Sequence, residues 1–236
     1  MKKVLILSSG GLDSTYLVYE NLKKGNLVRT LYTTVQNNGH KPESEKKSLE
    51  LQKEYFLKNF PNQLETYYNN VEILISYPQD NLILKQIPLW IMSMLYYCEG
   101  VDEIQVGYVM NDDAISFLED IKGIYKSYEF LFDNKCPELI FPLTKTKKEE
   151  IINKIPQELI NTIVFCEAPL YGGEKYKPCG GCAVCKRYKN NGLFEIIINS
   201  NHKVYLEKTS DIQDLIVPYE ELKGLVENLS DSDSEK

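Results

Sequence analysis

Long apolar runs, a basic excess and internal repeats are all absent from this 236-residue chain. No stretch approaches the roughly 18 apolar residues that would indicate a membrane-spanning helix. The net charge of -7 argues against broad, nonspecific binding to a nucleic-acid backbone. The opening MKKVLIL breaks after a short apolar stretch into Ser-Ser-Gly-Gly, so we expect no secretory signal, no membrane partner and a cytoplasmic location.

The composition is that of an ordinary soluble globular protein, with 43% hydrophobic and 26% charged residues. The length suits one large domain, or one domain with a small appendage. Three stretches, KPESEKK, TKTKK and KPCGGCAVCKRYK, are locally basic. Charge runs of this kind are more often solvated surface than binding patches, and we favour that interpretation here.

Apolar periodicity predicts alternating strands and helices through the first half of the chain. This alternation is typical of an α/β fold in which crossover helices connect parallel strands. We expect strands at residues 2–7, 27–32, 71–75 and 103–106, and helices at residues 13–24, 43–55 and 87–98.

The second half carries weaker signals. A loop from Gly107 precedes a helix at residues 117–132, and Thr146 with Glu149 forms a capping-box pattern before a helix that ends near Lys154. A last strand is expected at residues 162–165, and the acidic end SDSDSEK is expected to be disordered. The predicted organisation is an α/β domain, a four-cysteine segment, an extension and a tail, at residues 1–160, 161–195, 196–229 and 230–236.

The stretch SSGGLDST follows the first strand directly. A glycine-rich turn between a parallel strand and its helix presents backbone amides and the positive end of the helix dipole, which together favour phosphate. Asp13 is placed to cap the helix or to help hold a phosphate-bound magnesium ion. The competing interpretation is a plain tight turn with an aspartate cap, which Gly-Gly alone would favour. The hydroxyl-bearing residues are Ser8, Ser9, Ser14 and Thr15.

This loop lacks the Gly-Lys-Ser/Thr ending and the third glycine of the two commoner phosphate loops. Residues 9–14, SGGLDS, instead resemble the SGGxDS loop of the PP-loop ATP pyrophosphatases. That resemblance implies a Rossmann-like fold of the adenine nucleotide alpha hydrolase kind, with the loop gripping the pyrophosphate part of ATP. The implied ATP-binding residues are Ser8, Ser9, Gly10, Gly11, Leu12, Asp13, Ser14 and Thr15, with Asp13 and Ser14 also catalytic.

Four of the six cysteines lie close together near the end of the chain. Their spacing, Cys-x12-Cys-x2-Cys-x2-Cys, suits a tetrahedral zinc site with a structural role, and zinc is our preferred ligand. An iron–sulfur cluster and redox-active, sulfur-carrying cysteines remain as alternatives. The candidate ligands are Cys166, Cys179, Cys182 and Cys185.

The two motifs together resemble the 7-cyano-7-deazaguanine synthases (QueC), a branch of the PP-loop enzymes. The resemblance covers about residues 1–195 and includes Gln36 and His40, which echo the family's Gln-x-His, and Lys148, which belongs to a Lys-x-Glu-Ile pattern. It implies that ATP adenylates a 7-deazaguanine carboxylic acid, that ammonia displaces AMP, and that a second activation gives the nitrile. Gln36 and His40 are then expected at the substrate. Lys148 would contact phosphate or the substrate carboxylate, although a solvent-facing helical lysine is an equal alternative.

The loop after the fourth strand departs from that family's Asp-x-Ser-Gly-Tyr-Pro-Asp-like run and keeps only Asp113 and Ser116 as candidate substrate residues. This departure motivates a variant in which the activated acid is passed to another amine, such as one on a protein in antiphage defence. Two further hypotheses stay open, namely thiolation of tRNA by a related PP-loop enzyme and a nonenzymatic ATP-binding module. The family resemblance also allows a homodimer.

Overall fold

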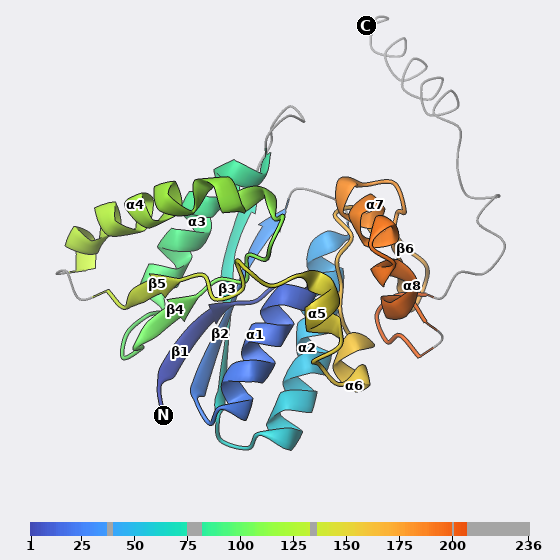
Figure 1. Cartoon of the computed structure of the whole chain (residues 1–236), viewed down its shortest axis with the longest axis horizontal. Coiled ribbons are helices and arrows are strands. Elements are labelled where there is room, and N and C mark those ends of the chain that lie inside the picture. The colour runs from blue at the N-terminus through green and yellow to red at the C-terminus, as the bar shows by residue number, and fades with distance from the viewer. Residues whose placement is uncertain (37–39, 75–81, 133–135, 200, 207–236) are drawn as a thin grey trace, which may run out of the picture. The chain divides into compact units, whose positions relative to one another are not determined.

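The computed structural model describes residues 1–36, 40–74, 82–132, 136–199 and 201–206, and residues Met1–Leu206 form one compact unit (Figure 1). The predicted acidic tail and most of the predicted extension lie outside the described residues. Among the described helices, none is long and apolar enough to cross a membrane.

A five-stranded parallel sheet forms the centre of this unit, with the strand order β3-β2-β1-β4-β5. The alternation of strands and helices in the sequence predicts this architecture, and the structure confirms the parallel α/β fold. β1 lies in the middle, so the chain moves outward through β2 and β3 and then crosses back to β4 on the other side. The strands are β1 (Lys3–Leu7), β2 (Leu27–Gln36), β3 (Leu64–Leu74), β4 (Glu103–Gln105) and β5 (Glu138–Ile140).

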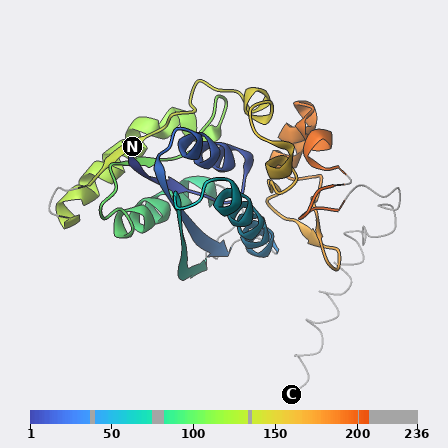
Figure 2. The ribbon, with the colours of Figure 1, turned by 90° about the horizontal axis from the view of Figure 1, so that it is seen from below.

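Helices cover both faces of the sheet (Figures 1 and 2). The alternation of side chains along a strand explains how β1 serves both layers, because Val4 and Ile6 belong to one core and Leu5 to the other. One layer contains α1 (Leu12–Lys23) and α2 (Lys41–Asn59), and the other contains α3 (Leu82–Tyr96) and α4 (Leu118–Tyr128).

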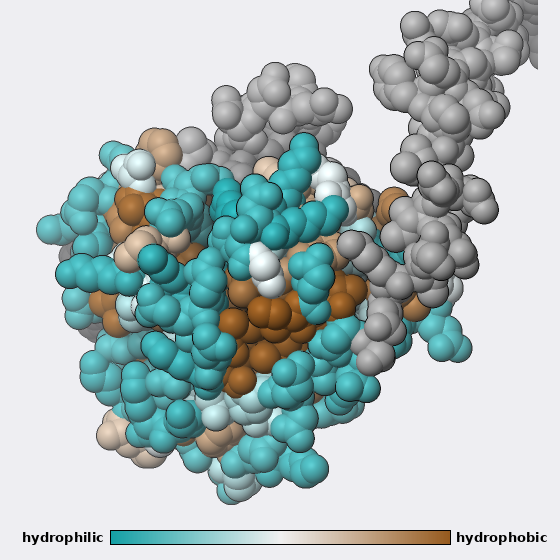
Figure 3. All heavy atoms as spheres, turned by 45° about the vertical axis from the view of Figure 1, so that its right-hand side comes forward, coloured by the Kyte–Doolittle hydropathy of each residue, from teal (hydrophilic) through white to brown (hydrophobic). Residues whose placement is uncertain are grey.

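The chain after β5 packs on the α1 and α2 side, away from α3 and α4, as both ribbon views show (Figures 1 and 2). Its buried side chains, including Ile151, Tyr188 and Tyr205, share one apolar core with α1 and α2. The face seen in Figure 3 is mostly polar, with one large apolar patch near its centre and smaller ones elsewhere. The elements are α5 (Lys148–Ile152), α6 (Gln157–Ile160), β6 (Leu170–Tyr171), β7 (Tyr176–Lys177), α7 (Ala183–Asn190) and α8 (Leu193–Ile197).

The end of α1 has a clear physical cause. Gly25 stands just past this helix with φ +76°, and its amide donates to the Leu22 carbonyl at 2.9 Å. Glycine populates this left-handed region without the steric penalty of a Cβ atom, which is why it can end the helix. Gly100, with φ +66°, lies in the turn between α3 and β4.

Three local predictions were wrong. The loop after Gly107 contains a 3₁₀ helix at Asp113–Phe117, because the Asp112 side chain accepts a hydrogen bond from the Ala114 amide and caps it. Thr146 is not a helix cap. Helix α5 begins after Lys147, and the Thr146 amide instead donates to the Leu143 carbonyl at 2.8 Å.

The strand expected at residues 162–165 is not formed. This buried segment makes its hydrogen bonds outside the sheet, since the Val164 amide donates to the Gly10 carbonyl and the Phe165 amide donates to the Tyr205 hydroxyl oxygen. The apolar composition of residues 162–165 indicates burial in the core. Buried strands and buried irregular segments have the same composition, so the sequence could not distinguish them. The short strand β5 was missed for the converse reason, because three residues are too few to give a periodic signal.

Candidate functional site

The glycine-rich loop lies at the carboxyl end of β1, where β2 and β4 flank that strand on opposite sides. The chain continues from β2 outward to β3 and from β4 outward to β5, in opposite directions across the sheet. Such a reversal opens a crevice at the carboxyl ends of the strands, which is the usual ligand site of open α/β folds. Gly11 is the N-terminal cap of α1 and supplies no side-chain cap, so the first amides of the helix stay directed toward the crevice. The loop therefore has the position and polarity of an anion-binding site.

Contacts with α2 and with residues 162–164 fix the shape of this loop. Gly10 has φ +76°, and a Cβ atom there would lie 2.5 Å from the Ser48 hydroxyl oxygen, so glycine is required for two reasons. The Gly10 carbonyl accepts hydrogen bonds from the Gln52 side-chain amide and from the Val164 amide, each at 3.1 Å. The Ser48 hydroxyl donates to the Thr162 carbonyl at 2.6 Å. Helix α2 and the segment before Cys166 thus hold the loop together.

Asp13, in the first turn of α1, is ion-paired with Lys148 at the start of α5. Both side chains are mostly buried, with exposures of 17% and 13%. Burial raises the pKa of Asp13, and the positive charge of Lys148 opposes that rise. The second carboxylate oxygen, Oδ1, is buried without a hydrogen-bond partner among the described residues. An unpaired buried carboxylate oxygen beside a phosphate-sized crevice fits a group that supplies positive charge, such as a phosphate-bound magnesium ion.

A cavity of about 200 Å³ opens in front of the loop. Ser9, Gly11 and Asp13 form part of its wall, and two aromatic side chains, Trp90 and Tyr108, form another part. Polar groups that bind phosphate and aromatic faces that stack on a planar ring are the two features that a nucleotide or nucleobase ligand needs.

Three polar side chains that the sequence interpretation missed also line this cavity, namely Tyr32, Lys41 and Glu45. Tyr32 donates its hydroxyl hydrogen to Glu45 at 2.8 Å. The Lys41 ammonium lies 2.6 Å from Glu167 and 4.0 Å from Glu45. Burial raises the pKa of Glu45 to about 7, although Lys41 and Tyr32 both act to lower it. Lys41 and Glu45 share a helix face at i,i+4 spacing, which is the one sequence signal that could have found them.

A second hollow of about 500 Å³ lies on the other side of the ion pair and is lined by Lys147, Lys148 and Arg187. Because Asp13 lines the first cavity and Lys148 the second, the pair stands between them. The Lys148 ammonium also lies 5.6 Å from the centre of the Tyr188 ring, and Tyr188 stacks on Phe165 with ring centres 4.3 Å apart. This cation–π contact connects α7, through Lys148 and Asp13, to the glycine-rich loop.

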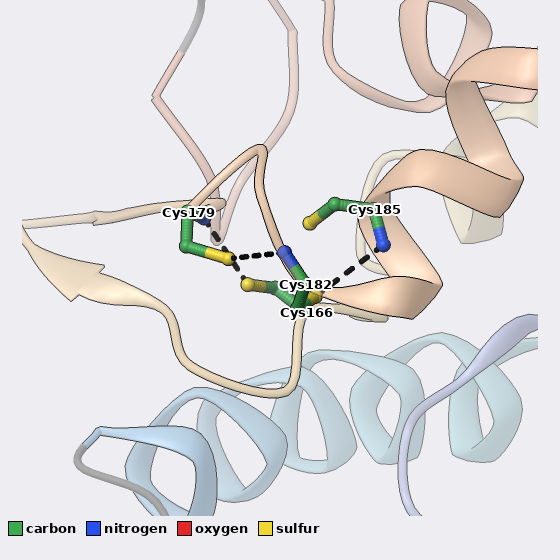
Figure 4. Close-up of side chains that lie close together, drawn as sticks. All are labelled: Cys166, Cys179, Cys182 and Cys185. Atoms are coloured by element: carbon green, nitrogen blue, oxygen red, sulfur yellow. Dashed lines mark hydrogen bonds between the residues drawn. The ribbon is translucent and has the colours of Figure 1, made fainter.

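The four predicted metal ligands come together, as Figure 4 shows, with all four sulfur atoms within 4.8 Å of one another. A tetrahedral zinc ion with Zn–S bonds of about 2.3 Å would separate its sulfurs by about 3.8 Å, so the cluster fits such a site. Backbone amides already donate to three sulfurs at 3.1–3.4 Å, which favours thiolates. A hydrogen bond from the Cys185 thiol lowers the pKa of Cys166. The cluster could therefore bind a metal ion.

Two buried aromatic residues support the start of this cysteine segment. The Tyr205 hydroxyl oxygen accepts hydrogen bonds from the Phe165 and Cys166 amides, both at 3.0 Å. The His202 ring accepts at Nδ1 from the Val204 and Tyr205 amides, at 3.1 and 2.7 Å. With Nδ1 occupied, Nε2 carries the proton and donates to the Ile163 carbonyl at 3.0 Å.

The remaining predicted site residues lie in different surroundings. The wall of the first cavity does not include His40, Asp113 or Ser116 among the described residues. His40 packs near the Tyr171 ring, and Asp113 pairs with Arg187 at 3.1 Å and is 64% exposed. Gln36 ends β2, and its side chain lies outside the described part. Leu12 and Thr15 are fully buried, and the Thr15 hydroxyl donates to the Gly11 carbonyl at 2.7 Å.

No protein-family model and no curated protein matches this sequence. A solved 4-thiouridine synthetase in complex with RNA and bound ATP is 18% identical, with a TM-score of 0.47 over 97% of this chain. The chain spans 51% of that protein. The U34-tRNA thiolase NcsA of Methanococcus maripaludis, with its [4Fe-4S] cluster, is 15% identical over 92% of this chain and 78% of its own, with a TM-score of 0.41.

The NMN synthetase of Francisella tularensis is 21% identical over 67% of this chain and 59% of its own, with a TM-score of 0.36. Similarity at these identities concerns the fold alone. The chemistry of this chain is therefore argued from its own residues.

Proposed function

We propose that this protein is an ATP-dependent enzyme of the PP-loop type that adenylates a carboxylic acid and releases pyrophosphate. The observation that carries the proposal is the SGGLDS loop at the carboxyl end of β1, with Asp13 paired to Lys148 in front of a cavity. The loop amides and the α1 terminus would bind the pyrophosphate part of ATP. Magnesium, held through Asp13, would neutralise charge on the leaving pyrophosphate when bound.

The substrate we propose is a 7-deazaguanine carboxylic acid. The sequence resemblance to the 7-cyano-7-deazaguanine synthases supports this choice, and the aromatic walls Trp90 and Tyr108 suit a planar bicyclic ring. The carboxylate would attack the α-phosphate of ATP, and ammonia would then displace AMP to give an amide. A second activation with loss of water would give the nitrile.

In this proposal the residues mainly position and polarise the reactants. The Gly10–Gly11 backbone and the hydroxyls of Ser9 and Ser14 replace water around the pyrophosphate, and Lys148 balances the negative charge that gathers beside Asp13. The four cysteines would hold a structural zinc ion that orders α7, whose Tyr188 supports Lys148. The cysteine segment would thereby stabilise the ATP site without touching the substrate.

A second candidate keeps the adenylation and transfers the acyl group to an amine other than ammonia. The observation that favours it is the capped 3₁₀ helix at Asp113–Phe117, where the resembling family has a different substrate loop. Asp113 of that helix pairs with Arg187, which lines the second hollow, and a hollow of about 500 Å³ would have room for part of a larger acceptor.

A single incubation distinguishes these candidates. The protein is mixed with ATP, magnesium and 7-carboxy-7-deazaguanine, with and without ammonium, and AMP, pyrophosphate and the nitrile are followed by mass spectrometry. Nitrile formation supports the synthase, whereas acid-dependent AMP release without nitrile supports transfer to another amine. ATP binding without any AMP would contradict both and favour a nonenzymatic ATP-binding module.

Thiolation of tRNA is the remaining alternative, because four clustered thiols could also carry sulfur or an iron–sulfur cluster. Elemental analysis of protein purified without oxygen tests this point. One tightly held zinc ion per chain would leave no free thiol among the four for sulfur transfer. Iron and inorganic sulfide in their place would favour the thiolase.

A further inference from the structure

The wall of the first cavity carries an acidic cluster that the adenylation step does not use. Glu45 and Lys41 come from α2, Tyr32 comes from β2, and Glu167 follows the first cysteine of the metal cluster. Tyr32, Lys41 and Glu45 all line the cavity that Asp13 also lines. The cluster is therefore part of the space in which an activated acid would lie.

The charges of this cluster favour a cation. Two carboxylates, Glu45 and Glu167, share the single ammonium of Lys41, which lies closer to Glu167, at 2.6 Å, than to Glu45, at 4.0 Å. Glu43, on the same helix, is exposed and adds a further negative charge nearby. Glu45 is thus incompletely neutralised and only 15% exposed, which suits it to receive an incoming ammonium group.

We infer that Glu45 is the general base that deprotonates the amine acceptor, so that the free amine can attack the acyl adenylate. This inference rests on the proposed function and extends it to the second half-reaction. An amine reaches the cavity as its ammonium ion and cannot attack until a base removes a proton and frees the lone pair.

The step balances in atoms and charge. The ammonium gives one proton to the Glu45 carboxylate, and its nitrogen lone pair forms the bond to the acyl carbon. The bond between that carbon and the phosphate oxygen breaks, and its electron pair leaves with AMP. A second nitrogen proton passes to solvent, after which Glu45 loses its proton and returns to the carboxylate.

Glu45 has the properties that this role requires. Its pKa of about 7, raised by burial, matches the neutral pH at which proton transfer must run in both directions. The 2.8 Å hydrogen bond from Tyr32 fixes the carboxylate in the wall of the cavity, so Tyr32 acts as a positioning residue. Lys41 limits how far the pKa rises, because its charge favours the carboxylate form.

The test compares Glu45→Gln with Glu50→Gln, a matched control at an exposed site on the same helix. Three rates are measured with 7-carboxy-7-deazaguanine: exchange of labelled pyrophosphate into ATP, amide formation from ammonium, and hydroxamate formation from hydroxylamine, which is already a free base at neutral pH. Exchange reports the first half-reaction, in which Glu45 has no proposed role.

We expect Glu45→Gln to keep pyrophosphate exchange and hydroxamate formation but to lose about 10²- to 10⁴-fold in amide formation from ammonium. The wild-type rate with ammonium should show a bend near pH 7, where Glu45 titrates, whereas the rate of the variant should follow the fraction of free ammonia and rise through this range without the bend. Glu45→Asp should restore part of the rate. Glu50→Gln should behave as the wild type in all three measurements.

Equal losses with ammonium and hydroxylamine, or a loss of exchange itself, would overturn the inference, because a base acting only on ammonium predicts neither. Unchanged amide formation would overturn it as well. If the wild-type protein shows no acid-dependent exchange, the proposed adenylation is contradicted, and the proposed role of Glu45, which depends on it, is contradicted as well.

Discussion

Asp13 and Lys148 form an ion pair although 135 residues separate them in the sequence. Asp13 follows directly on the glycine-rich loop, in the first turn of α1. Lys148 begins α5, the helix that leads toward the cysteine segment. Tyr188 of that segment packs its ring under the Lys148 ammonium. The pair therefore connects the loop that would bind ATP with the cysteine segment that could bind a metal.

Lys148→Met should lower the acid-dependent release of pyrophosphate about 10²- to 10³-fold, because it removes one charged group that offsets the charge of the leaving phosphates. Lys154→Met, at an exposed position after the same helix, is the matched control and should leave the rate unchanged. Steady-state assays of pyrophosphate release measure both. A Lys148→Met enzyme with the wild-type rate would show that this lysine only completes a structural ion pair.

Gly10→Ala should abolish ATP binding and destabilise the fold by more than Gly25→Ala does. Both glycines have φ +76°, so both substitutions carry the left-handed backbone penalty of about 1–2 kcal/mol. Only at Gly10 does the added methyl group meet another atom, the Ser48 hydroxyl oxygen, since nothing lies within 4 Å at Gly25. Denaturant unfolding measures the difference in stability, and equal losses at the two sites would contradict the packing argument.

If the four cysteines hold a metal ion as proposed, removing it should release α7 and weaken the proposed ATP site. A strong chelator, or Cys185→Ser, is expected to lower the melting temperature, because a half-buried four-thiol cluster would then lack the ion that orders its segment. Cys136→Ser is the control, since Cys136 lies outside the cluster. Metal content, thermal melting and ATP affinity are measured together. A chelated protein with unchanged ATP affinity would contradict the proposed support of Lys148 by α7.

The buried His202 should make the free energy of unfolding depend on pH. Burial lowers the pKa of His202 from 6.5 to about 4, so the unfolded chain binds its proton first as the pH falls. The stability gained by keeping this ring neutral is complete above pH 6.5 and is lost as the pH falls to about 4. The loss amounts to about 3 kcal/mol, since one pKa unit corresponds to about 1.4 kcal/mol.

His202→Asn keeps an acceptor near the position of Nδ1 and cannot be protonated in this range. The free energy of unfolding, measured in denaturant between pH 7 and pH 4, should therefore change less in the variant than in the wild type. The difference between the two slopes removes the contribution of acid-driven metal release, which both proteins share. Identical slopes would show that His202 is not the group that titrates.

The parallel α/β fold could be predicted from the sequence because its signals are local and repeated. Each buried strand is a short apolar run, and Gly25, in the left-handed region, marks the end of α1. The four cysteines could likewise be grouped, since two-residue spacings bring thiols together within single turns.

The rest of the site depends on contacts between distant segments, which leave no local pattern. Residues 162–165 look like a strand because they are buried, and only the fold shows that Val164 bonds to the phosphate loop instead. Glu45 is one of several charged residues on α2, and its pKa near 7 comes from burial in the folded chain, which the hydrogen bond from Tyr32 opposes. Lys148 and Asp13 could each be named from a short motif, but their pairing could not.

The most direct test of the central claim is the transfer of oxygen from the acid to AMP. 7-Carboxy-7-deazaguanine labelled with ¹⁸O in its carboxylate is incubated with the protein, ATP, magnesium and ammonium, and the AMP is analysed by mass spectrometry. Adenylation of the carboxylate places one labelled oxygen in each AMP once the amine has displaced it. AMP without label, or ADP and inorganic phosphate as the products, would contradict the account.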